Sequence, residues 1–270
     1  MEGSREYALA LARASAGAVL FAFPLLMTME MWFLGFYMDR YRLALFLVLN
    51  LPLLIGLSYY AGFERTADWR DDVLDALSAL AVGFVASAAM LGLFGVLKPG
   101  MPLQEAVGKI ALQAVPASMG AMLARKQLAG DGGGGEGREE AASYGGELFL
   151  MTVGAIFVGF NVAPTEEIAL IAFQMTSWHA VLLALASLLA LHALVYTVGF
   201  GGQESRGGHG LVSVFLRFTL VGYGIALIVS LYVLWTFGRI DGAGISTTAM
   251  TVVVLAFPAA LGAATARLIV

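Results

Sequence analysis

Eight long apolar segments are the feature that most restricts the fold of this chain. They cover about residues 9–36, 43–62, 73–96, 103–124, 147–175, 178–199, 211–236 and 245–268. A helix crosses the hydrocarbon core of a bilayer with ~20 mainly apolar residues. The composition agrees, because 60% of the 270 residues are hydrophobic and only 13% are charged. The sequence therefore predicts an all-α, polytopic membrane protein with eight transmembrane helices.

The first and the fourth of these segments differ from the others. The first is too long for the apolar core of a signal peptide, and no clear small-residue cleavage site follows it, so we interpret it as a retained span. The fourth is the least apolar. It carries Glu105, Lys109 and Gln113 at a spacing that puts them on one helical face, and composition makes it the weakest of the eight predicted spans.

The chain also aligns with itself. Residues 16–63 match residues 153–200 without a gap, with 14 identities over 48 positions. The informative pairs are Gly17/Gly154, Phe23/Phe160, Thr28/Thr165, Glu30/Glu167, Met38/Met175, Tyr59/Tyr196 and the paired ends Gly62-Phe63/Gly199-Phe200. With small gaps, residues 116–125 also match 258–267. The predicted organisation is a four-helix repeat over 1–125, a flexible cytoplasmic linker over 126–145, and a second four-helix repeat over 146–270.

The number of helices in each half sets the predicted topology. Because four is even, both halves enter the membrane from the same side and form a parallel repeat. Ten Lys and Arg residues fall on the side of the termini and linker, and five fall on the other side. The positive-inside rule then predicts a multi-pass protein of the bacterial inner (plasma) membrane with both termini cytoplasmic. Small residues at Gly120/Ala124 and Gly262/Ala266 predict backbone-to-backbone packing of the fourth and eighth helices.

An acidic motif interrupts the fifth segment. Pro164 lacks an N–H and its ring clashes with a helix, while Thr165, Glu166 and Glu167 follow as the first turn of a new segment. The sequence therefore predicts a discontinuous fifth helix. In the first half Pro24 takes the place of Asn161, so any interruption there is expected earlier and milder.

The carboxylates of this motif and of its first-half match are the best functional lead. A carboxylate inside a membrane costs about 2.5–3.5 kcal/mol on insertion scales, so one found there is a functional-site hypothesis. We predict that Glu30 and Glu167 face each other across the pseudo-twofold axis, in the outer half of the membrane, and bind an ion or metal with Glu166. Asn161 and Thr165 are the further ion-binding candidates. The alternatives are helix N-terminal carboxylates favoured by the dipole, or solvated ends near the headgroups.

Other polar residues are predicted to line a pathway to this site. Tyr37 and Gln174 follow the glutamates by seven residues and share their helical faces. Asn50 and Ser187, also aligned, add candidates from the second and sixth helices. His192 is either a proton-responsive group or a helix-interface histidine.

The residues that are missing restrict the chemistry. The chain has no Cys, which excludes disulfides and thiolate metal sites, and its three histidines stand apart without an HExxH or GxSxG signature. We therefore expect no enzyme activity. Carboxylates with amide and hydroxyl neighbours suit hard cations or protons.

The predicted function is a cation channel or a proton-coupled cation transporter. The alternatives are a structural or assembly subunit of the membrane without transport activity and, less favoured, an intramembrane enzyme. No cofactor is expected beyond a bound cation, with Ca²⁺, Na⁺ and K⁺ left open. The expected partners are the lipid bilayer and an inorganic cation or proton, with no nucleic acid and with a homo-oligomer left open.

Two resemblances add to this prediction. Residues 29–38 (MEMWFLGFYM) and 161–168 (NVAPTEEI), with the length and span count, resemble an uncharacterised bacterial family of integral membrane proteins. That family implies no mechanism. The Asn/Pro/acidic motif is also similar, over about ten residues per half, to sites of the calcium/cation antiporter superfamily, which uses inverted repeats. This second resemblance implies only that acidic groups at helix breaks bind cations.

Overall fold

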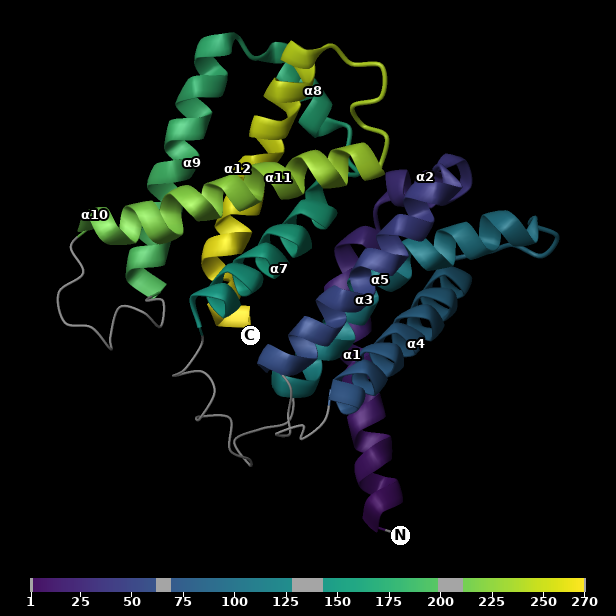
Figure 1. The fold of residues 1–270 in the computed structure, drawn as a ribbon. Coiled ribbons are helices and arrows are strands. Elements are labelled where there is room, and N and C mark those ends of the chain that lie inside the picture. The colour runs from purple at the N-terminus through teal and green to yellow at the C-terminus, as the bar shows by residue number, and fades with distance from the viewer. Residues whose placement is uncertain (1, 62–68, 128–142, 199–210, 270) are drawn as a thin grey trace. The chain divides into compact units, whose positions relative to one another are not determined.

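The protein folds into helices throughout the part that the structure describes. The computed structural model covers residues 2–61, 69–127, 143–198 and 211–269, and no strand occurs among them (Figure 1). Most of the predicted linker and the paired ends Gly62-Phe63 and Gly199-Phe200 lie outside the described residues. Eight helices are long and apolar enough to cross a membrane: Ala8–Leu26, Arg40–Tyr60, Trp69–Leu93, Leu103–Ala124, Tyr144–Val162, Ser177–Tyr196, Val212–Thr236 and Ile245–Ala266. The predicted all-α membrane fold with eight spans is confirmed.

The chain divides into two compact units, Met1–Gly135 and Glu136–Val270. The helices of unit 1 are α1 (Glu2–Leu26), α2 (Met29–Tyr37), α3 (Arg40–Ala61), α4 (Trp69–Leu93) and α5 (Leu103–Gln127). Unit 2 contains α7 (Tyr144–Val162), α8 (Glu167–Gln174), α9 (Ser177–Val198), α10 (Leu211–Val214), the π-helix η1 (Phe215–Leu220), α11 (Val221–Thr236) and α12 (Ile245–Ile269). The predicted parallel relation between the two units stays a prediction.

Helix α5 is the centre of unit 1. It contacts α1, α2, α3 and α4, and its side chains from Ala111 to Ala124 are all buried. Small residues along it let the neighbouring backbones approach closely. The segment that composition made the weakest span is therefore the most enclosed helix of its unit.

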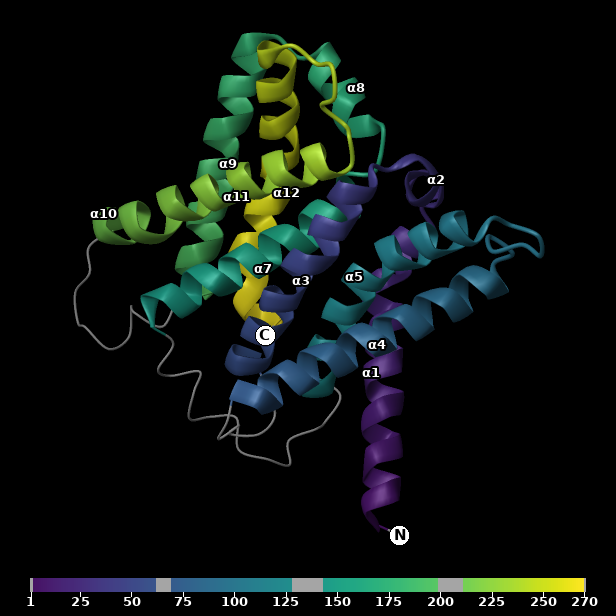
Figure 2. The same cartoon turned by 45° about the vertical axis from the view of Figure 1, so that its right-hand side comes forward.

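Helix α12 has the same place in unit 2, where it contacts α7, α8, α9 and α11 (Figure 2). The helices around each centre carry most of the exposed apolar side chains. Leu20, Val85 and Ile228 are 65%, 70% and 70% exposed. Apolar side chains on the outside suit contact with lipid, whereas backbone groups are satisfied inside the helices.

The first helix of each unit contacts the central helix through glycines. A Cβ on Gly17 would lie against Ala124 Cβ and 2.5 Å from the Gly120 carbonyl oxygen. A Cβ on Gly154 would lie against the Gly262 carbonyl oxygen and 2.9 Å from Ala266 Cβ. These small residues therefore pack the central helix against the first helix of the same unit, and the predicted packing of the fourth and eighth helices stays a prediction.

The helix bounds follow the internal alignment of the sequence. Helix α9 begins at Ser177, 137 positions after α3 begins at Arg40, and the two end with the same offset. Helix α12 begins at Ile245, 142 positions after α5 begins at Leu103, again with the same offset at both ends. These two pairs of corresponding segments thus form helices of equal length.

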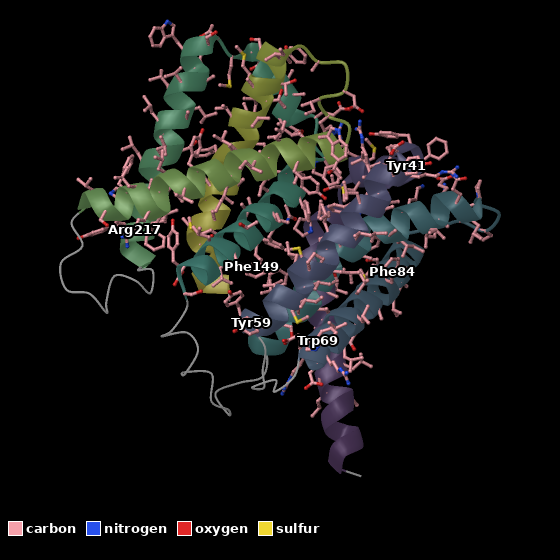
Figure 3. The ribbon with its side chains drawn as sticks, viewed as in Figure 1. Tyr41, Tyr59, Trp69, Phe84, Phe149 and Arg217 are labelled. Atoms are coloured by element: carbon pink, nitrogen blue, oxygen red, sulfur yellow. The ribbon has the colours of Figure 1, made fainter. Side chains whose placement is uncertain are left out.

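Exposed aromatic residues mark the two ends of unit 1. Figure 3 shows Tyr41 at one end of the unit and Tyr59 with Trp69 at the other. Tyr41 is 86% exposed and Trp69 is 70% exposed. Tyr and Trp are enriched at membrane interfaces, so these residues indicate where the span of α3 begins and ends.

Candidate functional site

The first span of unit 1 is interrupted at Met27 and Thr28. Helix α1 ends at Leu26 and α2 begins at Met29, so two residues separate the helices, and Met29 follows Pro24 by five positions. The predicted earlier position is wrong, since the interruption aligns with that of the second half. The interruption is milder, as predicted, because two residues separate the helices here and four separate them in the second half.

Side chains bind the carbonyl groups that this interruption frees. Thr28 Oγ1 donates to the Pro24 carbonyl at 2.6 Å, and Trp32 Nε1 donates to the Leu26 carbonyl at 2.9 Å. Gln113 Nε2 of α5 donates to the Leu25 carbonyl at 3.0 Å. Irregular backbone at membrane depth survives only where protein or water satisfies it. Side chains of unit 1 therefore stabilise the interruption by binding its free carbonyl groups.

The predicted discontinuous fifth helix is present in unit 2. Helix α7 ends at Val162 and α8 begins at Glu167. Thr165 donates to the Val162 carbonyl through its backbone N–H at 3.2 Å and its hydroxyl at 2.9 Å. Asn161 Nδ2 donates to the Phe157 carbonyl at 2.7 Å, while its buried Oδ1 has no hydrogen-bond partner within the described parts of the chain. Asn161 thus leaves an oxygen acceptor beside the interruption.

Contacts with α5 give the depth of the first interruption. Leu25 pairs with Gln113, the midpoint of the candidate span Leu103–Ala124. Gly35 of α2 packs against Gly108 and Lys109, nearer to the Leu103 end. At about 1.5 Å per residue, Gln113 lies about 15 Å from that end, which is half of a hydrocarbon core. The interruption between α1 and α2 therefore lies level with the middle of α5.

The interruption of unit 2 lies at a matching depth. Gly154 packs against Gly262 and Ala266, at the last turns of the candidate span Ile245–Ala266. Pro164 follows Gly154 by ten residues, or about 15 Å along the helix. Both units thus break their first span about halfway along the central helix.

The predicted carboxylates follow directly after the two interruptions. Glu30 lies in the first turn of α2 and is half-buried, between the contact points of Leu25 and Gly35. Glu167 is the first residue of α8, and Glu166 is its N-cap residue; both are exposed within the described structure. The side chain of Glu166 makes no capping hydrogen bond. Helix capping therefore does not account for that carboxylate.

The electrostatic setting of these three carboxylates is favourable only in part. Each lies at a helix N-terminus, where the dipole stabilises negative charge by about 0.3–1 kcal/mol. No hydrogen bond or ion pair of these carboxylates occurs among the described residues. That stabilisation is smaller than the insertion cost of about 2.5–3.5 kcal/mol. The bound cation expected from the sequence stays a prediction.

The structure places the predicted pathway residues in different surroundings. Tyr37 and Gln174 end α2 and α8 and are exposed. Asn50 is buried and donates to Ser118 Oγ at 2.9 Å, whereas Ser187 is buried and donates to the Leu183 carbonyl at 2.7 Å. No hydrogen bond or ion pair within the described residues joins these four residues to the glutamates.

His192 contacts the π-helix of unit 2. Its Nδ1 lies 2.8 Å from the Thr219 hydroxyl, and its ring meets Phe215 edge-on with centroids 5.5 Å apart. π-Helical turns are frequent at functional sites. The contact holds the imidazole in place, as expected of a helix-interface histidine, and it leaves the proton-responsive role a prediction.

Within the described residues, no group of three or more His, Asp or Glu side chains is placed to hold a metal ion. Glu166 and Glu167 belong to unit 2 and Glu30 belongs to unit 1. The predicted metal site across the two halves therefore stays a prediction.

A family model matches residues 10–270 of the chain. Its description reads "Putative integral membrane protein (DUF2391)". The chain belongs to this family. No curated protein and no solved structure matches it. The resemblance to the uncharacterised bacterial membrane family is thus confirmed, and the similarity to the calcium/cation antiporter superfamily is unsupported.

The fourth predicted span of this DUF2391 chain carries a buried polar stripe. The stripe of Glu105, Lys109 and Gln113 lowered the apparent quality of the fourth span. In the structure Lys109 is 9% and Gln113 is 1% exposed, and Lys109 Nζ pairs with Glu105 Oε1 at 2.7 Å. The spacing of these three residues places them on one face of α5, and this polar face lies in the interior of unit 1.

Proposed function

We propose that this DUF2391 protein is a cation channel or proton-coupled cation transporter of the membrane. The observation that supports the proposal is the matched interruption of the first span in each unit. Each interruption lies near mid-span and is followed by a glutamate, Glu30 or Glu167, in the first turn of the next helix. Broken helices of this kind form ion sites in transporters.

The chemistry of the neighbouring groups favours a hard cation. Glu166 and Glu167 supply carboxylate oxygens, and the unbound Oδ1 of Asn161 supplies an amide oxygen near the same interruption. Oxygen ligands of this type suit Ca²⁺, Na⁺ or K⁺. A cation also offsets the cost of a carboxylate inside the bilayer.

Flux measurements on the purified protein in proteoliposomes test the proposal. Ca²⁺, Na⁺, K⁺ and H⁺ are screened separately with ion-sensitive dyes, first for the wild type. For the ion that moves, we expect Glu30→Gln and Glu167→Gln each to lower the flux by about tenfold or more, since a lost charged ligand costs several kcal/mol.

The control is Asp71→Asn, which removes an exposed carboxylate in the first turn of α4, at the end of a span. It should leave the flux unchanged. Size-exclusion profiles in detergent verify that all variants fold. If no ion moves through folded wild-type protein, the transport proposal fails and an assembly subunit becomes the better account.

A further inference from the structure

Buried polar side chains of unit 1 follow one another from one end of the unit to the other. At the start of α5, Glu105 and Lys109 form their ion pair with side chains 20% and 11% exposed. Gln113 follows one turn later and is 1% exposed. Beyond it, Ser118 of α5 accepts a hydrogen bond from Asn50 of α3, and both are buried.

The series continues to the opposite end of the unit. Ser58 of α3 donates to Asp72 Oδ1 of α4 at 2.9 Å, and these side chains are 1% and 5% exposed. Glu105 and Ser118 are about 20 Å apart along α5, and Asn50 and Ser58 are about 12 Å apart along α3. The polar residues therefore extend over about 30 Å, the thickness of a hydrocarbon core.

Several atoms along this series have no protein partner. Gln113 Oε1, Asn50 Oδ1 and Ser87 Oγ are buried and without a hydrogen-bond partner among the described residues. Ser87 lies one turn from Gly83 of α4, which packs against Ala114 and Ser118 of α5. Buried polar groups that lack protein partners are normally bound by water. These three atoms therefore indicate internal water at the middle of unit 1.

The corresponding positions of α12 are different. Glu105, Lys109, Gln113 and Ser118 correspond at the offset of 142 to Thr247, Thr251, Leu255 and Ala260. Thr251 donates its hydroxyl to the Thr247 carbonyl of its own helix. Unit 2 also has buried polar atoms without a hydrogen-bond partner among the described residues, such as Ser230 Oγ, but this atom lies on α11 and not on the central helix. A charged polar series along the central helix thus belongs to unit 1.

We propose that unit 1 holds a hydrated path along α5 that conducts protons between Glu105 and Asp72. The inference rests on the proposed function, because it names the proton as a transported or coupling ion and places its route. The ion pair acts as a relay. Glu105 takes a proton from water at its end, Lys109 releases one to the water beside Gln113, and transfer from Glu105 to Lys109 restores the pair.

The remaining groups carry the proton onward without net change. Each water beside Gln113, Ser87, Asn50 and Ser118 accepts one proton and gives up another. Asp72 accepts the proton at the far end and releases it to bulk water. The alternative is that these buried polar residues only specify how the helices pack and do not move protons.

The experiment measures proton flux into proteoliposomes that contain trapped pyranine, driven by a K⁺ gradient with valinomycin. Gln113→Leu and Ser118→Ala install the residues that α12 has at these positions. We expect Gln113→Leu to lower proton flux by about tenfold or more, because one unmade hydrogen bond slows a step by that factor. Ser118→Ala should act in the same direction, and Thr251→Val, the matched change in α12, should leave the flux unchanged.

A second measurement does not depend on flux. The chain has no Cys, so Ser87→Cys and Ser118→Cys each provide a single thiol at the path. Ag⁺ added to the liposomes should react with both thiols but not with Ala260→Cys or Ala263→Cys, two fully buried positions of α12. Proton flux of wild-type rate in folded Gln113→Leu, or equal Ag⁺ reaction at all four thiols, overturns the path.

Failure of the path and failure of the proposed function can be told apart. Cation flux that depends on Glu30 and Glu167 without any proton flux overturns the path and leaves a cation channel. Proton flux that depends on Gln113 but not on either glutamate overturns the site at the interruptions and leaves the path.

Discussion

Single glycines set the distance between the first and the central helix of each unit. At Gly154 an added Cβ would meet the Gly262 carbonyl oxygen, which is backbone and cannot move aside. We expect Gly154→Ala to destabilise the protein by about 1–3 kcal/mol through overpacking. In detergent, thermal unfolding followed by tryptophan fluorescence should show a midpoint lower by about 2–8 °C.

Gly224 provides the matched control for this substitution. It also lies inside a helix, α11, but nothing lies within 4 Å of an added Cβ. Gly224→Ala should leave the midpoint unchanged or raise it, because Ala favours the helix by up to about 1 kcal/mol. Equal midpoints for Gly154→Ala and the wild type would contradict the close approach of α7 and α12.

Proline positions alone do not predict where a helix of this protein breaks. Pro116 and Pro258 lie inside continuous α5 and α12, and Pro24 lies inside α1 with the interruption three residues later. A break also needs groups that bind the freed carbonyls, and Gln113 supplies one of them from another helix. Sequence reasoning found the motif at Pro164 but not this long-range partner, since the contact depends on packing.

Removing the ring of Pro164 should lengthen the helices at the second interruption. In Pro164→Ala the new backbone N–H is able to donate to the Phe160 carbonyl four residues earlier. Because Pro costs about 3 kcal/mol inside a helix, we expect amide exchange at residues 165–167 to slow by about tenfold or more. Hydrogen–deuterium exchange with mass spectrometry of peptides covering these residues measures this change.

Pro258→Ala is the control, because Pro258 already lies within a continuous helix. It should leave the exchange at residues 165–167 unaltered. Unchanged exchange in Pro164→Ala would mean that contacts of α8 with α12, and not the proline, hold the interruption open.

At the scale of the whole molecule, hydropathy predicts the eight spans but not which of them is central. Helices α5 and α12 are enclosed by their neighbours, so lipid contact does not require them to be strongly apolar. The polar stripe at Lys109 and Gln113 is tolerated for that reason. The repeat predicts which segments of the two halves correspond, whereas helix pairing and the relation between the units depend on surfaces that periodicity does not reveal.

The membrane topology is a separate prediction for the whole chain. Eight spans put both termini on one side, and the excess of Lys and Arg there predicts the cytoplasm. In a bacterial host, green fluorescent protein fused to the C-terminus should fluoresce. Alkaline phosphatase fused after residue 100, in the segment between α4 and α5, should be active. Phosphatase activity at the C-terminus and none after residue 100 would reverse the orientation.

The central claim is that carboxylates at two matched interruptions carry cations through this DUF2391 protein. Its most direct test is the cation flux of folded Glu30→Gln/Glu167→Gln protein in proteoliposomes, compared with the wild type for the ion that moves. We expect the flux to fall to the level of protein-free liposomes while the unfolding midpoint stays within a few degrees of the wild type. Wild-type flux in the double variant would contradict it.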